Sequence, residues 1–293
     1  MSITAAMVKD LRERTGAGMM ECKRALTDAG GDIEAAIEAM RKSGAAKAVK
    51  KAGRVAAEGQ VIITVADDRK QASIVEVNCE TDFVGKDENF IRFAEETGAI
   101  ALAEGAEDAE SLSGKTMSDG KSVEEARQEL VSKIGENIQV RRVEKITASE
   151  GEIGFYRHGV RIGVVVELAG GDATLARDIA MHIAASRPVC IDESGVPAEL
   201  LEKEREIFSA QARESGKPDN IVEKMVTGRM KKYLKEVTLL GQPFVKNPDQ
   251  TIEALLKDAD AKVMQFSRVE VGEGVEKKQE DFAAEVMAQV KSS

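Results

Sequence analysis

The chain has 293 residues, of which 42% are hydrophobic, 32% are charged and only 3% are aromatic. This balance is typical of a globular protein, and the length allows two or three compact units. No apolar run approaches the ~20 residues of a membrane-spanning helix, and the first residues lack the basic and apolar regions of a signal peptide. We therefore expect a cytoplasmic protein that is not associated with a membrane.

The charge is unevenly distributed along the chain. Residues 1–54 carry eleven basic and seven acidic side chains, a net charge of +4 that leaves −14 for the remainder of a chain with net charge −10. An acidic chain binds nucleic acid poorly because phosphate contacts need Lys and Arg. No direct nucleic-acid binding is expected, and the basic segment favours a protein partner with an acidic patch over RNA.

Sequence patterns of catalysis, cofactor binding and metal binding are missing. The chain has no phosphate-binding Gly-x-x-x-x-Gly-Lys-[Ser/Thr] loop and no Gly-x-Ser-x-Gly motif. Cys22, Cys79 and Cys190 are far apart and odd in number, which favours reduced, mostly buried thiols. His158 and His182 have no metal-ligand spacing around them; we expect His182 on a helix near the core surface and His158 exposed beside a Tyr. We therefore predict no enzyme, no cofactor and no metal.

Residues 4–43 show the pattern of three short helices. Apolar residues recur at helical spacing, Thr4 and Asp32 are candidate N-caps, and glycines separate the helices. A bundle of this size has a small core and is more typical of an interaction module than of an enzyme. Residues 44–57 are rich in Ala and Lys and predict a solvated helical connector.

From residue 57 the apolar pattern changes to a period of two, and a weak repeat emerges. The segment 57–61 is similar to 149–153, and each copy predicts a β-hairpin, with strands at 61–66 and 72–78 and at 154–157 and 162–168. Each hairpin is followed by a predicted helix, at 89–103 and at 174–186. A hairpin plus a helix used twice predicts two related α+β subdomains.

The two copies differ in the loop after the second strand. The second copy has a plain loop at 169–172, whereas the first has the longer segment 79–87 with Phe83 between acidic and glycine residues. Surface loops rarely keep a large apolar side chain exposed, which favours Phe83 folding back onto its own core. The alternative is that Phe83 projects as a wedge toward a partner.

The last third of the chain predicts further helices. Residues 197–238 indicate an antiparallel helical hairpin whose apolar stripes either pair with each other or form a homodimer interface. A loop at 239–245, a short helix at 251–257, a strand at 262–271 and an amphipathic helix at 281–290 follow. The terminal helix would dock either on its own core or on a partner.

Several motifs resemble the bacterial translation elongation factor Ts family. They are carried by residues 11–26, 76–84, 158–163, 181–185, 228–232, 241–245 and 271–274, in order along nearly the whole chain. The resemblance implies an α+β protein of five parts, one of which is built from two segments of the chain. These are a ubiquitin-associated-like module at 1–54, a core N-subdomain at 55–140, a core C-subdomain at 141–196 and 239–274, an inserted helical hairpin at 197–238 and a C-terminal helical module at 275–293.

The same resemblance implies a function and its residues. The partner would be elongation factor Tu, a GTPase that holds GDP tightly, and this chain would be its guanine-nucleotide exchange factor. Asp82 and Phe83, within the motif Thr81–Val84, would enter the partner near its Mg²⁺ and phosphate loops. The N-terminal contact surface would comprise Val8, Lys9, Arg12, Met19 and Met20, and His158 would be a second contact from the core.

Other classes of function stay open at the level of sequence. A binding adaptor or chaperone-like module would form the complex without accelerating GDP release. An RNA-binding ribosome factor would show a steep dependence of affinity on salt, although the charge of −14 outside the N-terminal module argues against it.

Overall fold

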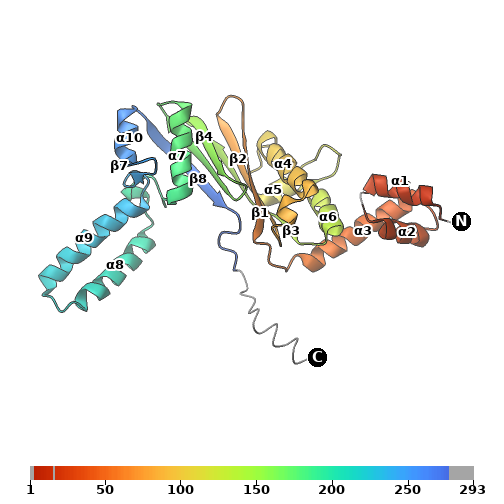
Figure 1. The fold of residues 1–293 in the computed structure, drawn as a ribbon, viewed down its shortest axis with the longest axis horizontal. Helices are drawn as coiled ribbons and strands as arrows, with labels where there is room; N and C mark the ends of the chain where they lie inside the picture. Colours follow the sequence, from red (N-terminus) through yellow and green to blue (C-terminus); the bar gives the residue numbers. More distant parts are fainter. Residues whose placement is uncertain (1–2, 16, 277–293) are drawn as a thin grey trace. The chain divides into compact units, whose positions relative to one another are not determined.

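The computed structural model describes residues 3–15 and 17–276 and has a mixed α+β fold (Figure 1). The chain forms two compact units. The first contains the described residues of 1–62, 75–144 and 270–293, and the second contains 63–74 and 145–269. No helix in the described ranges is both long and apolar enough to cross a membrane. The helix predicted at 281–290 and nearly all of the predicted module 275–293 lie outside the described residues.

The N-terminal part of the first unit is a bundle of three helices, as predicted. Helices α1 (Ala5–Thr15), α2 (Met19–Asp28) and α3 (Ile33–Lys51) enclose a small apolar core of Val8, Leu11, Cys22, Leu26 and Ala36. The Asp32 carboxylate accepts a hydrogen bond from the Ala35 amide at 3.0 Å and so caps α3.

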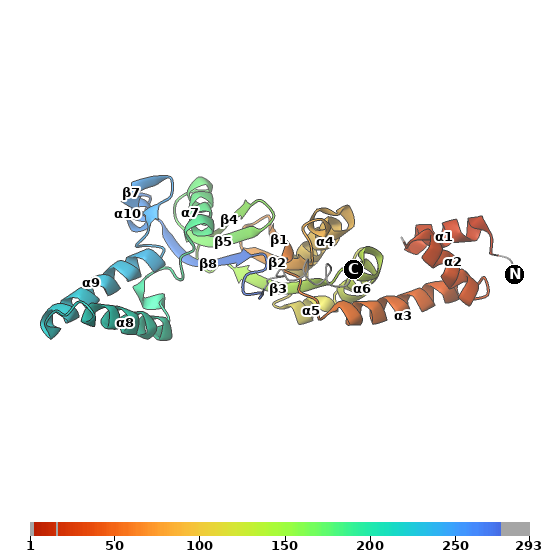
Figure 2. The same cartoon turned by 60° about the horizontal axis from the view of Figure 1, so that its bottom comes forward.

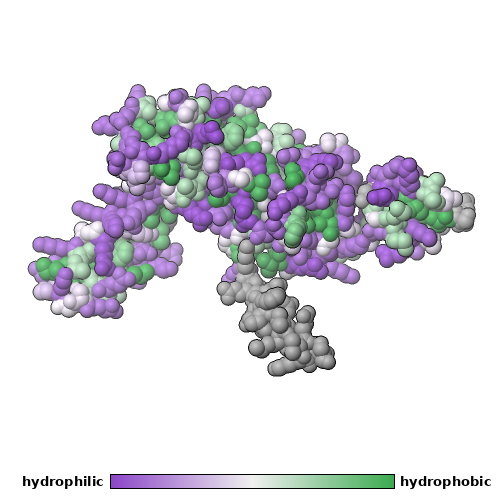
Figure 3. Space-filling view, in the orientation of Figure 1, coloured by the Kyte–Doolittle hydropathy of each residue, from purple (hydrophilic) through white to green (hydrophobic). Residues whose placement is uncertain are grey.

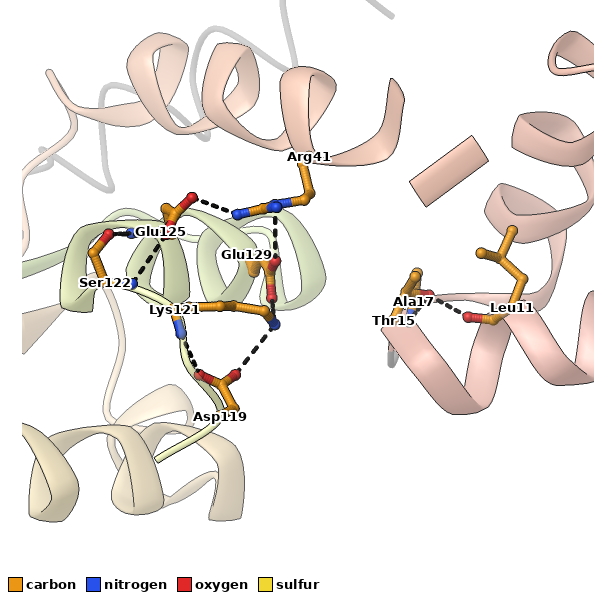
Figure 4. Close-up of polar contacts among 9 residues, drawn as sticks. All are labelled: Leu11, Thr15, Ala17, Arg41, Asp119, Lys121, Ser122, Glu125 and Glu129. Carbon is orange, nitrogen blue, oxygen red and sulfur yellow. Dashed lines mark hydrogen bonds and ion pairs between the residues drawn. The ribbon is translucent and has the colours of Figure 1, made fainter. Parts of the chain in front are cut away.

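The predicted solvated connector is a continuation of α3, and one of its faces is buried. Gly44 and Ala48 are buried against α6 (Val123–Ile134), and a Cβ on Gly44 would lie 3.6 Å from the Ser132 Cβ. Polar contacts flank this packing: Arg41 pairs with Glu125, as Figure 4 shows, and Lys47 Nζ donates to Ser132 Oγ at 3.3 Å. An apolar stripe was absent from the sequence because small residues, rather than large ones, let the two helices approach.

The first sheet has the order β1-β2-β3 and carries the first predicted hairpin. Its strands are β1 (Glu58–Val65), β2 (Gln71–Cys79) and β3 (Ile138–Thr147). Helix α4 (Glu88–Ala103) follows β2, and Phe90 and Phe93 pack with residues of β2, β3 and α6 in one apolar core. Helix α5 (Ala109–Ser113), α6 and β3 fall in the stretch 104–148, to which the sequence patterns assigned no elements.

The second sheet has the order β4-β5-β8 and carries the second predicted hairpin. Strands β4 (Glu152–His158) and β5 (Ile162–Ala169) pair antiparallel, with Ile153 opposite Glu167 and Phe155 opposite Val165. Helix α7 (Ala173–Ser186) packs on this hairpin. The third strand, β8 (Lys262–Glu270), follows the short helix α10 (Ile252–Asp258), and both confirm predicted elements.

Two sequence predictions in the second unit are wrong in detail. The predicted loop 239–245 ends in a short strand, β6 (Pro243–Phe244), which pairs with β7 (Asn247–Thr251).

His182 lies on α7 as predicted but is fully buried rather than near the surface. Its Nε2 lies 2.9 Å from the Gln242 Oε1, and its Nδ1 accepts from the Val245 amide at 3.2 Å. Burial lowers the pKa of His182, partly opposed by the Gln242 hydrogen bond, so the ring is neutral at pH 7.

The predicted helical hairpin is formed by α8 (Ala198–Arg213) and α9 (Asp219–Val237), which lie antiparallel in Figures 1 and 2. The helices pair within the chain: Phe208 and Tyr233 meet edge to face with ring centroids 6.3 Å apart, and Arg229 lies 5.9 Å from the Phe208 ring centroid. Figure 3 shows apolar side chains between hydrophilic ones on this hairpin. A role in homodimerisation stays a prediction.

The two sheets share two features at corresponding positions. Gly59 in β1 and Gly151 just before β4 both sit where a Cβ would meet a carbonyl oxygen of the next strand, that of Val77 at 2.0 Å and that of Leu168 at 2.2 Å. Each of these carbonyls follows a fully buried glutamate, Glu76 in β2 and Glu167 in β5. These matching constraints support the duplicated α+β core that the sequence repeat predicted.

Candidate functional site

The candidate site is the connection between β2 and α4, residues Glu80–Asp87, which is fixed to the first unit by its backbone. The Thr81 amide and Oγ1 donate to the two carboxylate oxygens of Glu136 at 3.0 and 2.8 Å. On the other side of the loop, the Gln60 side chain donates to the Gly85 carbonyl at 2.8 Å. The loop therefore has a rigid base, because its backbone polar groups are satisfied by buried or half-buried side chains.

Apolar and capping contacts close the base of the loop. Val84 is buried in the core that contains Phe90, and residues Val84–Lys86 form a single 3₁₀ turn, η1. The Asp87 carboxylate accepts hydrogen bonds from the Asn89 and Phe90 amides and so caps α4. Cys79, at the end of β2, donates its thiol to the Thr81 carbonyl at 3.1 Å. Burial and the nearby carboxylate of Glu136 raise the pKa of Cys79 to about 12, which keeps it an unreactive thiol at pH 7.

Phe83 projects from this base into solvent. Its side chain is 81% exposed, the largest exposed fraction among the large apolar residues that the structure describes. The expectation that Phe83 folds back onto its own core is wrong. Its backbone is in the ordinary helical region (φ −63°, ψ −48°), so the exposure results from the path of an anchored turn rather than from strain.

Asp82 and Lys86 flank Phe83 on the exposed side of the loop. Lys86 Nζ lies 2.7 Å from Asp82 Oδ2. The hydrogen bond and the charge of Lys86 lower the pKa of Asp82, so this carboxylate is ionised at pH 7. The loop thus presents a benzyl group and an anion side by side, with a basic residue of the same turn compensating the anion.

The predicted N-terminal surface divides into exposed and buried members. Met19 and Met20, at the start of α2, are 61% and 77% exposed, and Lys9 and Arg12 on α1 are also exposed. Val8 belongs instead to the bundle core. The bundle therefore presents two exposed methionines and two basic side chains, while Val8 holds α1 in place.

His158 lies in the second unit, at the end of β4. It is exposed, as predicted, and its Nδ1 is 3.2 Å from the hydroxyl of Tyr156. The neighbouring Tyr156 packs against the core of the second unit, and its hydroxyl is a polar partner for the exposed imidazole.

Comparison with known proteins assigns the chain to a family. The family model described as "Elongation factor TS" matches residues 80–273. Over the full length of both chains, the sequence is 65% identical to "Elongation factor Ts" of Thioalkalivibrio sulfidiphilus and 61% identical to that of Methylococcus capsulatus. The chain belongs to the elongation factor Ts family. Its broad role is therefore that of a translation elongation factor.

Sequence reasoning missed the residues that hold the loop of this elongation factor Ts chain in place. Glu136 and Gln60 are separated from their partners Thr81 and Gly85 by 55 and 25 positions. Glu136 follows the left-handed Gly135 that ends α6, and the helix-ending glycine is the one local signal at this place. Nothing in that signal points to a contact with residue 81.

Proposed function

We propose that this chain is the guanine-nucleotide exchange factor of elongation factor Tu and acts without forming or breaking covalent bonds. The observation that carries the proposal is the exposure of Phe83 on a loop whose base is anchored. An exposed benzyl group on a rigid support loses little conformational entropy when a partner buries it. Membership of the elongation factor Ts family supports elongation factor Tu as the partner.

The mechanism follows from differential binding. A GTPase holds GDP through backbone donors, a lysine and Mg²⁺ around the phosphates. An exchange factor must bind the opened nucleotide site better than the closed one. Phe83 would fill an apolar gap that exists only in the opened partner, and its burial would contribute ~2–3 kcal/mol to that preference. Because coupling is reciprocal, GDP would weaken the complex by the same factor by which the complex weakens GDP.

Asp82 would act on the polar side of the same site. As an anion delivered beside the Mg²⁺ site, it would compete for the groups that organise the metal and the phosphates. In the free chain, the charge of Asp82 is compensated by an exposed ion pair with Lys86. Solvent screens this pair, so Asp82 could give it up at little cost for contacts with a partner. Thr81 and Val84 would position the loop, through the Glu136 contact and the buried side chain respectively.

A second surface would hold the wedge in place. We infer that the N-terminal module at 1–54 supplies this grip through Met19, Met20, Lys9 and Arg12, with Val8 supporting α1 from inside. Exposed methionines adapt to irregular apolar surfaces, and the net charge of +4 suits an acidic patch. His158 would add a contact from the second unit.

The wedge is tested by Phe83→Ala in stopped-flow release of a fluorescent GDP from elongation factor Tu. The intact chain should accelerate release, and the variant should slow the catalysed rate by about 30- to 150-fold, the equivalent of ~2–3 kcal/mol. Val189→Ala, which truncates an exposed apolar side chain of the second unit to which the proposal gives no role, is the control and should leave the rate unchanged. An unchanged rate for Phe83→Ala would exclude the wedge, and complex formation without acceleration by the intact chain would indicate an adaptor.

The grip is tested by the double variant Met19→Ala/Met20→Ala. Loss of two partly exposed apolar contacts should weaken the affinity for the nucleotide-free GTPase about tenfold, whereas the release rate at saturating concentration should stay near that of the intact chain. Calorimetry gives the affinity and stopped-flow gives the rate. Unchanged affinity would exclude the α2 surface from the interface.

A further inference from the structure

An open cavity in the second unit concentrates positive charge. It has a volume of about 510 Å³ and lies at the edge of the second sheet, between β4, α7, the turn from β1 to β2 and the turn from β6 to β7. Four of its lining residues are cationic, namely Arg69, Arg157, Arg177 and Lys246, and one is acidic, namely Asp178. A net charge of +3 around one cavity stands out in a chain whose total is −10.

The arginines of this cavity are available for a ligand. Lys246 pairs with Asp178 at 2.5 Å, which accounts for the one carboxylate. Among the described residues, no carboxylate lies within ion-pair distance of Arg69, Arg157 or Arg177. Three arginines that line one cavity without a counter-ion repel one another, and a bound anion would relieve that repulsion. Guanidinium forks match phosphate oxygens in geometry.

An aromatic side chain and backbone donors lie at the same place. Phe155, on β4, lines the cavity and is 42% exposed. The Ile153 amide donates to the Arg69 carbonyl at 2.9 Å and therefore points away from β5. In an antiparallel pair, every second residue of an edge strand directs its backbone N–H and C=O away from the neighbouring strand. The amides of Phe155 and Arg157 therefore face the open edge, beside the cations. A flat apolar ring next to phosphate-binding groups is the arrangement on which nucleic-acid bases stack.

We propose that this cavity binds the phosphodiester backbone of single-stranded RNA, with one base stacked on Phe155. The proposal goes beyond nucleotide exchange and concerns a surface of the second unit that contains neither Phe83 nor the N-terminal module. An acidic peptide that extends the sheet is the competing occupant. The open edge of β4 is too short for an added strand. The Ile153 amide is already bonded to the Arg69 carbonyl and β4 ends at His158, so only Phe155 and Arg157 have outward backbone groups that a peptide could pair with. Two such residues are too few for stable strand addition, which favours RNA as the occupant.

The experiment measures binding of a fluorescein-labelled 12-nucleotide single-stranded RNA to the full chain, alone, by fluorescence anisotropy over a range of salt concentrations. With three phosphates contacted, the slope of log K against log salt should be about −2 for a single strand. Arg157→Glu/Arg177→Glu should weaken binding at least tenfold and bring the slope to within about 0.7 of zero. Phe155→Ala should weaken binding about tenfold with an unchanged slope, because stacking carries no counter-ion release.

Matched controls separate the cavity from total charge. Lys217→Glu/Lys224→Glu changes the net charge equally at two exposed positions of the helical hairpin and should leave RNA binding within twofold of that of the intact chain. Circular dichroism melting would establish that all variants fold. Equal losses in both double variants would overturn the proposal in favour of unspecific attraction. Tighter binding of a poly-glutamate peptide than of RNA would overturn it in favour of an acidic protein partner. Because the GTPase is absent, either result leaves the exchange proposal untouched.

Discussion

The connection from β2 to α4 and the connection from β5 to α7 join equivalent elements in different ways. Both end in an aspartate that caps the following helix, Asp87 for α4 and Asp172 for α7. The second connection is the short, glycine-rich segment 170–172, whereas the first inserts the anchored turn that carries Phe83. The shared cap shows that the frame needs only a short loop, so the extra residues of the first connection are free to serve another purpose.

The buried glutamates of the two sheets show the same divergence in another form. Glu76 pairs with Arg141 at 3.0 Å and Arg142 at 2.6 Å and also accepts from the Gly272 amide at 2.8 Å. Glu167 has no cationic partner among these contacts. One of its oxygens accepts from three successive backbone amides, those of 149–151, at 2.7 to 3.0 Å, and the other accepts from Gln265 at 2.7 Å. At corresponding positions of the two sheets, a buried carboxylate is thus stabilised by arginines in one sheet and by backbone and side-chain amides in the other.

The largest expected effect tests whether the two sheets share one backbone constraint. Gly59→Ala and Gly151→Ala would each place a Cβ 2.0–2.2 Å from a carbonyl oxygen, and each should lower the free energy of unfolding by about 4 kcal/mol. Gly53→Ala, whose Cβ would meet no atom within 4 Å, is the control and should change it by less than about 0.5 kcal/mol. Urea denaturation followed by circular dichroism measures all three. A mild effect at one glycine alone would break the equivalence.

Substitution of the two buried glutamates should lower the stability by different amounts, with the larger loss at Glu76. Glu76→Gln leaves two arginines around a buried neutral amide and should lower the free energy of unfolding by about 3 kcal/mol. The exposed Glu223→Gln should leave the urea midpoint unchanged. If Glu76→Gln were as mild as this control, the other contacts of the two arginines, with Glu270 and Glu273, would suffice for them, and their ion pairs with Glu76 would not stabilise the first sheet.

Glu167→Gln should have a smaller effect at pH 7, about 2 kcal/mol, because the amide oxygen still accepts from backbone but the amide nitrogen faces Gln265. Burial opposes ionisation of Glu167, but the Gln265 and backbone hydrogen bonds outweigh it and lower its pKa to about 2. The unfolded chain therefore takes up this proton first. The contribution is complete above pH 4.5 and is lost as the pH falls toward 2.

The intact chain and the Glu167→Gln variant should respond differently to acid. Thermal melting of the intact chain between pH 2.5 and 6 should show stability falling with acid, and the Glu167→Gln variant should show a shallower fall over the same range. Parallel curves for the two proteins would mean that Glu167 is not held as an anion by its backbone donors.

Most local elements of this protein can be predicted from its sequence. Alternating apolar residues marked both β-hairpins, helical spacing marked α1, α2 and the first part of α3, and apolar stripes marked α8 and α9. Helices α4 and α7 were predicted from their place after each β-hairpin and begin near the predicted positions. These features depend on neighbours within a few residues, and they can therefore be predicted without a structure. The elements in the stretch 104–148 could not be predicted in this way, because α6 and β3 owe their stability to packing with α3, α4 and β2.

Tertiary structure alone decided which side chains face solvent. Val84 and Phe83 are adjacent and both apolar, yet Val84 enters a core already occupied by Phe90 and Phe93 while Glu136 and Gln60 hold the turn so that Phe83 points outward. The cavity with Arg69, Arg157 and Arg177 likewise gathers residues from three segments. Exposure and charge clustering depend on partners distant in sequence, and a net charge of −10 summed over the whole chain concealed a local excess of cations.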